Sequence, residues 1–177
     1  RDWGAAVLVA VLLCGGAAGL YVTWSNWSWS QPTHAAGGTA EDMVAALARR
    51  LETQPDDLQG WLMLGRSYAA LEQFPLAARA YQRASNLAGD RNADALTGWG
   101  EALIMQDESA LAGRGGRLFE QALAIDPGSQ KALFYGAVAA QRRGEAQLAI
   151  ERYTRLLALA PPENVRPLLE AQIAALK

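Results

Sequence analysis

One stretch of the sequence, residues 57–89, constrains the fold more than any other. It holds two sets of apolar and small residues, spaced mostly by three or four positions: Trp61, Leu64, Gly65 and Tyr68, then Ala77, Tyr81 and Ala84. That spacing places each set on one face of a helix. The stretch therefore predicts two packed helices, which Gly65 and Ala77 allow to approach closely. One hairpin cannot bury both apolar faces, so further hairpins must stack on it.

The same pattern recurs twice in the rest of the chain. The second copy has Leu96, Trp99, Gly100, Leu103, Phe119, Ala122 and Pro127, and the third has Leu133, Ala137, Ala140, Ala149, Tyr153, Leu156 and Pro161. Position 130 follows position 93 by 37 residues, about three more than the 34 of a tetratricopeptide repeat (TPR). We therefore predict an all-α TPR solenoid with repeats at 58–91, 93–129 and 130–162, the second with a lengthened turn.

Shorter helical patterns flank the three repeats. Thr39 and Asp42 have the spacing of a helix N-terminal capping pair, and an amphipathic helix follows over residues 40–52. At the other end, residues 163–177 follow a Pro-Pro pair and contain apolar residues at helical spacing. We interpret the first as a half-repeat and the second as a capping helix, together completing a domain at 40–177.

Residues 3–24 contain no charged side chain. A helix of 22 residues spans about 33 Å, enough to cross a hydrocarbon core of about 30 Å. Aromatic residues typical of membrane interfaces lie at both ends: Trp3, then Tyr21, Trp24, Trp27 and Trp29. We predict one transmembrane helix within 1–24 and a linker at 25–39. The start at Arg1 rather than Met indicates part of a longer chain.

Two alternatives for this N-terminal part stay open. Residues 33–35 offer a possible signal-peptide cleavage site, although the apolar run exceeds the usual 7–15 residues of such a peptide. Trp24, Trp27 and Trp29 could contact a flat ligand instead of only anchoring the chain. No Lys or Arg follows the apolar run until Arg49. That flank favours translocation of the carboxyl side, which places the repeats in the periplasm and the helix in a bacterial inner membrane.

The sequence offers no arrangement of residues suited to catalysis or to a cofactor. Its one His lies in the linker and its one Cys in the apolar run, so neither a metal site nor a dithiol is expected. The formal net charge of −2 argues against nucleic-acid binding, which requires a basic face. We therefore expect a non-enzymatic protein without a cofactor, whose function lies in its surface.

The first helix of each repeat is expected to line a concave groove. Helical phase places eight residues there as a candidate peptide-binding groove: Leu62, Arg66, Glu101, Ile104, Met105, Phe134, Val138 and Arg142. The same phase also directs Gln59, Ala69, Asp94, Thr97, Lys131 and Gln141 toward it. An apolar strip with charged edges suits an amphipathic helix. The alternative is that these residues only pack between repeats.

Several segments together resemble a known family. They are Pro-Asp-Asp-Leu-Gln-Gly-Trp from position 55, Gly-Trp-Gly-Glu-Ala-Leu from position 98, the Gly-rich turn after it, and Leu-Phe-Glu-Gln-Ala-Leu-Ala-Ile-Asp-Pro from position 118. With the preceding membrane helix and linker, they resemble the TPR subunit of the bacterial System I cytochrome c maturation machinery. Members of that family usually carry an additional membrane helix and a cytoplasmic segment before this part.

The resemblance implies a chaperone for apocytochrome c. It would hold the carboxyl-terminal amphipathic helix of the apocytochrome and present it to the haem-ligation subunits, beside the thiol-reducing subunits of the same system. A function from a different class also fits: a general membrane-anchored TPR scaffold that joins envelope proteins without a cytochrome client.

Overall fold

The computed structural model of this chain describes residues 38–177. The predicted transmembrane helix at 1–24 and nearly all of the linker at 25–39 lie outside the described residues. Within the described part, every helix is too short or too polar to cross a bilayer. Residues 39–177 form one compact unit, and the following paragraphs concern it alone.

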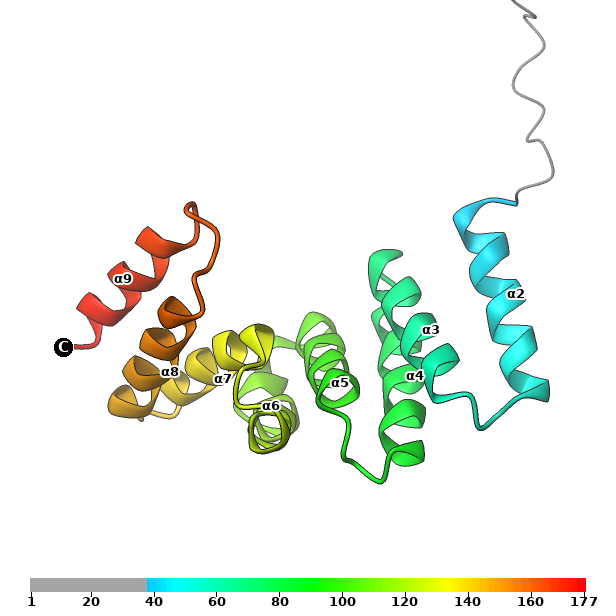
Figure 1. Ribbon diagram of the computed structural model, residues 1–177, viewed down its shortest axis with the longest axis horizontal. Coiled ribbons are helices and arrows are strands. Elements are labelled where there is room, and N and C mark those ends of the chain that lie inside the picture. The colour runs from blue at the N-terminus through cyan, green and yellow to red at the C-terminus, as the bar shows by residue number, and fades with distance from the viewer. Residues whose placement is uncertain (1–37) are drawn as a thin grey trace, which may run out of the picture. The chain divides into compact units, whose positions relative to one another are not determined.

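This unit consists of helices that follow one another in chain order (Figure 1). They are α2 (Ala40–Thr53), α3 (Leu58–Ala70), α4 (Phe74–Leu87), α5 (Ala93–Gln106), the 3-10 helix η1 (Glu108–Leu111), α6 (Arg114–Ile125), α7 (Gln130–Arg142), α8 (Ala146–Ala158) and α9 (Arg166–Ala175). Residues 38–177 contain no strand. The predicted all-α TPR-like solenoid is confirmed, with α3–α4, α5–α6 and α7–α8 as its three hairpins.

Side chains at three helix starts satisfy backbone amides that the helix itself leaves free. Thr39 and Asp42 form the capping box that their spacing indicates, with Asp42 Oδ2 accepting from the Thr39 amide at 2.9 Å. Asp57 accepts from the Gly60 amide at 2.8 Å before α3, and Asn92 accepts from the Ala95 amide at 2.8 Å before α5. Polar residues just outside the apolar pattern thus fix where these helices begin.

Each hairpin closes around one aromatic ring on its second helix. In the first hairpin the Tyr81 ring lies against Gly65, where an added Cβ would come within 2.9 Å of it. In the second, Phe119 lies equally close to Gly100, at 2.8 Å. Tyr153 is the corresponding buried ring of the third hairpin. Gly65 therefore makes room for the Tyr81 ring, whereas the sequence had suggested direct approach of the two backbones at Gly65 and Ala77.

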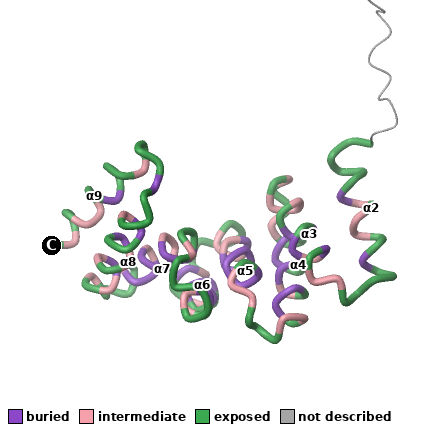
Figure 2. The backbone as a smooth tube through the Cα atoms, viewed as in Figure 1, coloured by how far each residue is buried: buried purple, intermediate pink, exposed green. Residues whose placement is uncertain are grey.

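Most residues of the repeat pattern are buried where the helices meet (Figure 2). The buried members are Leu64, Gly65, Ala77, Tyr81, Ala84, Leu96, Trp99, Gly100, Phe119, Ala122, Leu133, Ala137, Ala140, Ala149, Tyr153, Leu156 and Pro161. Trp61 and Tyr68 are only partly buried, and Pro127 is exposed. Trp61 is thus not the fully buried core aromatic that its place in the pattern suggests. Within the described residues the single helix α2 precedes this hairpin, so Trp61 is covered less completely there than Leu96, its fully buried counterpart in the second repeat.

The lengthened turn of the second hairpin contains a helical element of its own. Positions 107–113 separate α5 from α6, against 71–73 and 143–145 in the other hairpins. This turn contains η1, whose Leu111 is buried with Phe119 and Ala139. The extra residues therefore add to the core beside α7, where the sequence indicated only loop chemistry.

The first helices of the hairpins lie on the inner side of the stack. Helix α3 contacts α5, and α5 contacts α7. Among the described residues the backbones of the second helices lie farther apart, since no close backbone approach joins α4 to α6 or α6 to α8. The contact between α6 and α8 is made by side chains, through the ion pair of Glu120 with Arg152. Closer spacing of the first helices bends the stack toward them, so the predicted concave side is formed by α3, α5 and α7.

Candidate groove on the first helices

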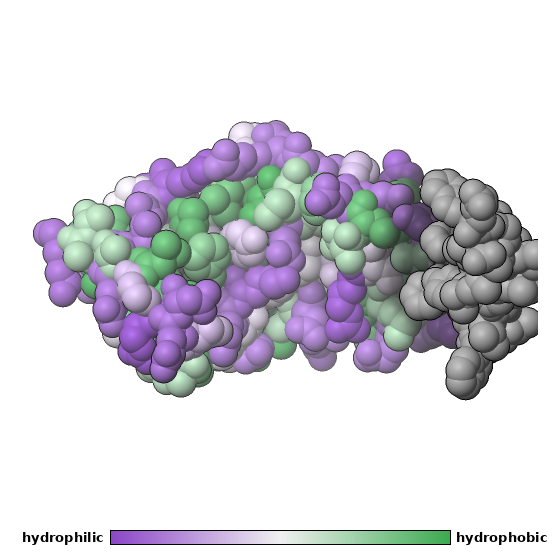
Figure 3. Space-filling model, turned by 90° about the horizontal axis from the view of Figure 1, so that it is seen from above, coloured by the Kyte–Doolittle hydropathy of each residue, from purple (hydrophilic) through white to green (hydrophobic). Residues whose placement is uncertain are grey.

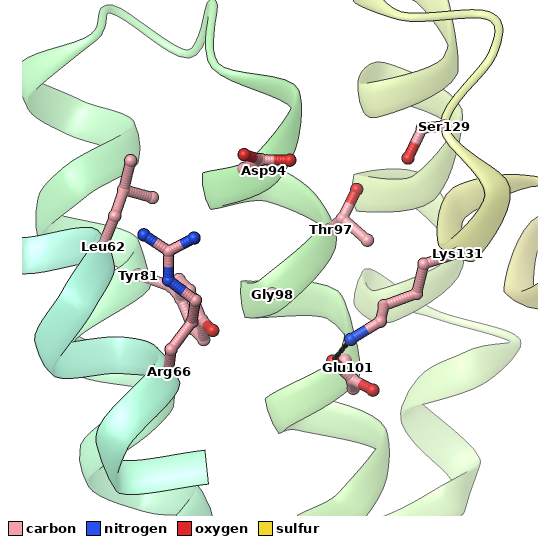
Figure 4. A pocket seen from close by; sticks show the side chains of 9 residues that line it. All are labelled: Leu62, Arg66, Tyr81, Asp94, Thr97, Gly98, Glu101, Ser129 and Lys131. Carbon is pink, nitrogen blue, oxygen red and sulfur yellow. Dashed lines mark hydrogen bonds and ion pairs between the residues drawn. The ribbon is translucent and has the colours of Figure 1, made fainter. Parts of the chain in front are cut away.

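Two adjoining hollows lie on α5 between α3 and α7. The first, of about 170 Å³, is lined mainly by residues with polar side chains: Leu62, Arg66, Tyr81, Asp94, Thr97, Gly98, Glu101, Ser129 and Lys131 (Figure 4). The second, of about 250 Å³, shares Arg66, Tyr81, Gly98, Glu101 and Lys131 and adds Ala69, Phe74, Ala102 and Met105. We call the first the polar pocket and the second the apolar pocket. Together they form a groove with one polar and one apolar end.

The groove exists because position 98 has no side chain. The equivalent residue of the third repeat is Tyr135, whose ring stacks on Phe119 with centroids 5.1 Å apart. At the first junction Gly98 lies directly against the Tyr81 ring instead. Gly98 and the Tyr81 ring therefore meet at the first junction, and both residues line the two pockets.

An ion pair crosses the groove from α5 to α7. Lys131 Nζ lies 2.7 Å from Glu101 Oε2 (Figure 4). The Tyr135 hydroxyl donates to Glu101 Oε1 at 3.4 Å. Glu101 is only 24% exposed, so the pair is less screened than one on an open surface. This contact fixes the rim of the groove on its α7 side.

Burial and the Glu101 carboxylate together change the acidity of two tyrosines. Desolvation by burial, followed by repulsion from Glu101, raises the pKa of Tyr81 to about 12. The same two causes raise the pKa of Tyr135 to about 12. Both hydroxyls are therefore neutral hydrogen-bond donors throughout the physiological pH range.

Four of the eight predicted groove residues line these pockets. Arg66 and Met105 are exposed, Glu101 is partly buried, and Leu62 is 3% exposed and also belongs to the core between α3 and α5. Three elements of the predicted groove thus meet here: a cation, an anion and an apolar wall.

The other four predicted residues lie further along α5 and α7. Ile104 and Val138 pack against the cluster around Leu111 and Phe119. Phe134 packs against the core of the third repeat and contacts the Tyr135 ring edge-on, with centroids 5.3 Å apart. These three therefore pack against core residues and also keep some exposed surface. Arg142 forms an ion pair with Glu108 of η1.

The sequence pattern left several pocket residues out of the predicted groove. The sequence pattern indicates only a structural role for Tyr81. It does not distinguish Gly98 or Ser129 as groove residues. Thr97 and Lys131 had the right helical phase. Thr97 offered a further signal, because the equivalent positions of the other repeats hold the apolar Leu62 and Phe134.

Apolar residues gather in a strip on one face of the molecule, with hydrophilic residues on both sides (Figure 3). Met105, on the rim of the apolar pocket, is 47% exposed. In the part of the chain from 38 to 177, no three His, Cys, Asp or Glu side chains lie close enough to hold a metal ion. The groove is thus built from the residue types that bind a peptide.

Comparison with known proteins identifies the family. The family model for the TPR domain of cytochrome c-type biogenesis protein H matches residues 34–167. The chain belongs to this family. The resemblance inferred from the sequence motifs is therefore correct, and it places the chain among TPR domains of cytochrome c-type biogenesis proteins.

Curated relatives carry names from the same process. The chain is 34% identical over 165 residues to the cytochrome c-type biogenesis protein CycH of Pseudomonas aeruginosa, a match covering 89% of this chain and 39% of that protein. It is 33% identical over 141 residues to the cytochrome c-type biogenesis protein CcmH of Escherichia coli, covering 76% and 39% respectively. The chain therefore spans about two fifths of the length of these relatives.

A solved structure shares the fold of this cytochrome c-type biogenesis TPR domain. The crystal structure of MamA superposes with a TM-score of 0.65 and 21% sequence identity, covering 77% of this chain and 71% of that one. At this identity the likeness concerns the stacked helical hairpins alone.

Proposed function

We propose that this TPR domain is a non-catalytic module that holds the carboxyl-terminal amphipathic helix of apocytochrome c. Membership of the family supports a role in cytochrome c biogenesis. The groove, with its apolar and charged residues, supports an amphipathic helix as the ligand. An apocytochrome must stay unfolded until haem is attached, so a chaperone for it has to bind a segment rather than a folded surface. An amphipathic helix is such a segment, recognised by anchors at every third or fourth residue.

The observation that supports this proposal best is the pairing of the two pockets on α5. The apolar pocket offers Phe74, Ala102 and Met105, and the polar pocket beside it offers Arg66 and Asp94. A helix that lays its apolar face on the apolar pocket would bring the polar edge of that face to the polar pocket. Methionine adapts to ligands of different shape, so Met105 suits several related clients.

The rest of the proposal concerns location and delivery. The apolar run at 1–24 would anchor the domain in a bacterial inner membrane with the repeats in the periplasm, where the bound apocytochrome reaches the haem-ligation and thiol-reducing subunits of the maturation system. A reporter enzyme that is active only outside the cytoplasm, fused after Lys177, should be active. An inactive reporter with a stable fusion protein would contradict this orientation.

Titration calorimetry of residues 39–177 with a synthetic peptide of an apocytochrome c carboxyl-terminal helix tests the binding proposal. The peptide should bind more tightly than a scrambled peptide of the same composition. Met105→Glu should weaken binding about tenfold or more, because a charge would face the apolar side of the helix. Met43→Glu is the matched control, since Met43 is 61% exposed on α2 and lines neither pocket.

The outcomes separate this function from that of a general scaffold. Equal binding of the native and scrambled peptides would reject the apocytochrome helix as the ligand. The general TPR scaffold would then be the remaining hypothesis. Equal loss of affinity in Met105→Glu and Met43→Glu would reject the groove as the binding site.

A further inference from the structure

One buried hydroxyl in the polar pocket has no hydrogen-bond partner. Thr97 is 5% exposed, and its Oγ1 bonds to none of the described residues. Buried polar groups almost always find a partner, because leaving one unpaired costs free energy. Figure 4 shows this oxygen on the side of the pocket where Ser129 lies. Packing does not require a hydroxyl here, since Leu62 and Phe134 occupy the equivalent positions of the other repeats.

Further donors surround Thr97 without being used. Within residues 38–177, Arg66 forms no ion pair. Ser129 is the residue before α7, and among the described residues its hydroxyl accepts no hydrogen bond from the backbone amides at the start of that helix. The Tyr81 hydroxyl also stays protonated at neutral pH, because burial raises its pKa to about 12. The pocket therefore presents one guanidinium and three hydroxyl groups with free hydrogen-bonding capacity.

The two carboxylates of the pocket, Asp94 and Glu101, do not accept hydrogen bonds from these free donors. Glu101 already accepts from Lys131 and from Tyr135. Asp94 is the second residue of α5, where the positive end of the helix stabilises an anion. In Figure 4 Asp94 and Glu101 lie at opposite ends of the pocket, with Arg66 on its α3 side and Thr97 on its α7 side. The middle of the pocket is therefore rich in donors.

We propose that the middle of the polar pocket binds a carboxylate of the partner, held by Arg66 and the Thr97 hydroxyl. This inference rests on the proposed function and adds a ligand group to it. A carboxylate presents only acceptors, and the fork of an arginine matches its two oxygens. The apolar pocket begins at the same Arg66 and continues past Ala69 to Phe74. A helix with a carboxylate at one end of its apolar face could thus occupy both pockets in only one orientation, with the carboxylate in the polar pocket.

Two sources can supply this carboxylate: the free carboxyl terminus of the partner, or an Asp or Glu side chain. Three synthetic amphipathic peptides of about 15 residues distinguish them. All share one apolar face. The first has a free carboxyl terminus and no acidic side chain, the second has an amidated terminus and one Glu in the last turn, and the third has an amidated terminus and Gln in place of that Glu.

Binding of each peptide to the full 177-residue chain is measured by titration calorimetry. At least one acidic peptide should bind about tenfold more tightly than the neutral peptide, as expected for one hydrogen-bonded charge. This advantage should fall to about twofold or less in Arg66→Gln, where one uncharged donor replaces the guanidinium. Thr97→Val keeps the shape of the side chain and removes the hydroxyl, so it should reduce the same advantage. Arg49→Gln, an exposed arginine of α2 outside both pockets, should leave it unchanged.

The results separate this inference from the function on which it rests. Equal binding of acidic and neutral peptides, with Met105→Glu still weakening both, would overturn the carboxylate site and leave the helix-binding groove intact. Failure of all three peptides to bind would overturn both. An acidic advantage that survives both Arg66→Gln and Thr97→Val would place the carboxylate elsewhere and overturn the assignment to this pocket.

Discussion

Gly98 lies so close to the ring of Tyr81 that a Cβ at position 98 would stand 2.4 Å from the Tyr81 Cζ atom. At the next junction of the stack, Tyr135 occupies the equivalent position and covers Phe119 instead. The two junctions are thus packed differently, by a ring against a glycine at the first and by two stacked rings at the second. The groove on α5 depends on this difference, because Gly98 and Tyr81 line both of its pockets.

Gly98→Ala should therefore destabilise the domain. Alanine gains about 1 kcal/mol over glycine in a helix, but its methyl group would overlap the buried Tyr81 ring, and overpacking of this kind costs about 1–3 kcal/mol. Urea unfolding followed by circular dichroism should show a net loss of unfolding free energy.

Gly136→Ala is the control for this experiment. Gly136 is also buried within a helix, but the atoms nearest to an added Cβ are the ends of the Arg152 and Leu123 side chains, at 3.1 and 3.2 Å. Because Arg152 Nη1 also donates to the Gly136 carbonyl and to Glu120, we expect a loss of stability that is smaller than that of Gly98→Ala. If Gly98→Ala were as stable as Gly136→Ala, the Tyr81 ring would not be held where we describe it.

The aromatic residues of the repeats should differ in their contribution to stability. Phe119 is 0% exposed, so Phe119→Ala should lower the unfolding free energy by about 3–5 kcal/mol. Trp61 is partly exposed and retains a hydrogen bond from its Nε1 to the Pro55 carbonyl at 2.9 Å. Trp61→Ala should cost only about 1–3 kcal/mol, because less apolar surface returns to water. The reverse order in chemical denaturation would contradict the burial described for these two residues.

The tyrosines of the groove should titrate above their ordinary pKa of 10.0. Because the folded state raises the pKa of Tyr81 and Tyr135 to about 12, it binds these protons more tightly than the unfolded chain does. The resulting stabilisation is complete below pH 10 and disappears as the pH rises through about 12. The ultraviolet absorbance of tyrosinate, compared with that of Tyr81→Phe and Tyr135→Phe variants, measures each pKa.

The Glu101→Gln variant shows how much of this effect comes from charge. Removing the carboxylate should lower the pKa of both tyrosines toward the ordinary value, since Glu101 is the second cause after burial. An unchanged titration in Glu101→Gln would show that Glu101 does not face these hydroxyls.

The repeat pattern was sufficient to predict the helices and their stacking. Trp61, Leu64 and Tyr68 share a face because of local spacing, and the capping pair at Thr39 and Asp42 marks the first helix in the same local way. Properties set by neighbouring residues in the chain can be derived without coordinates. The partial exposure of Trp61 could not, because it depends on how much of the ring a single preceding helix covers.

The groove was predicted in part for a related reason. Helical phase identified Leu62, Arg66 and Met105, because phase is a property of one helix. It could not show that Ile104 and Val138 are engaged by η1 and α6, since that contact arises from the insertion between α5 and α6. Nor could it reveal the pocket at Gly98, which exists only where the side chain of Tyr81 meets a glycine from the next repeat.

Site-specific photo-crosslinking tests the central claim most directly. A photoreactive residue replaces Met105 in one variant and Met43 in another, and each is irradiated with the apocytochrome c carboxyl-terminal peptide. We predict crosslinking at position 105, on the rim of the apolar pocket, and none above background at position 43. Excess unlabelled peptide should suppress it, and the scrambled peptide should not. Crosslinking at both positions alike, or at neither when the peptide is bound, would contradict binding in the groove.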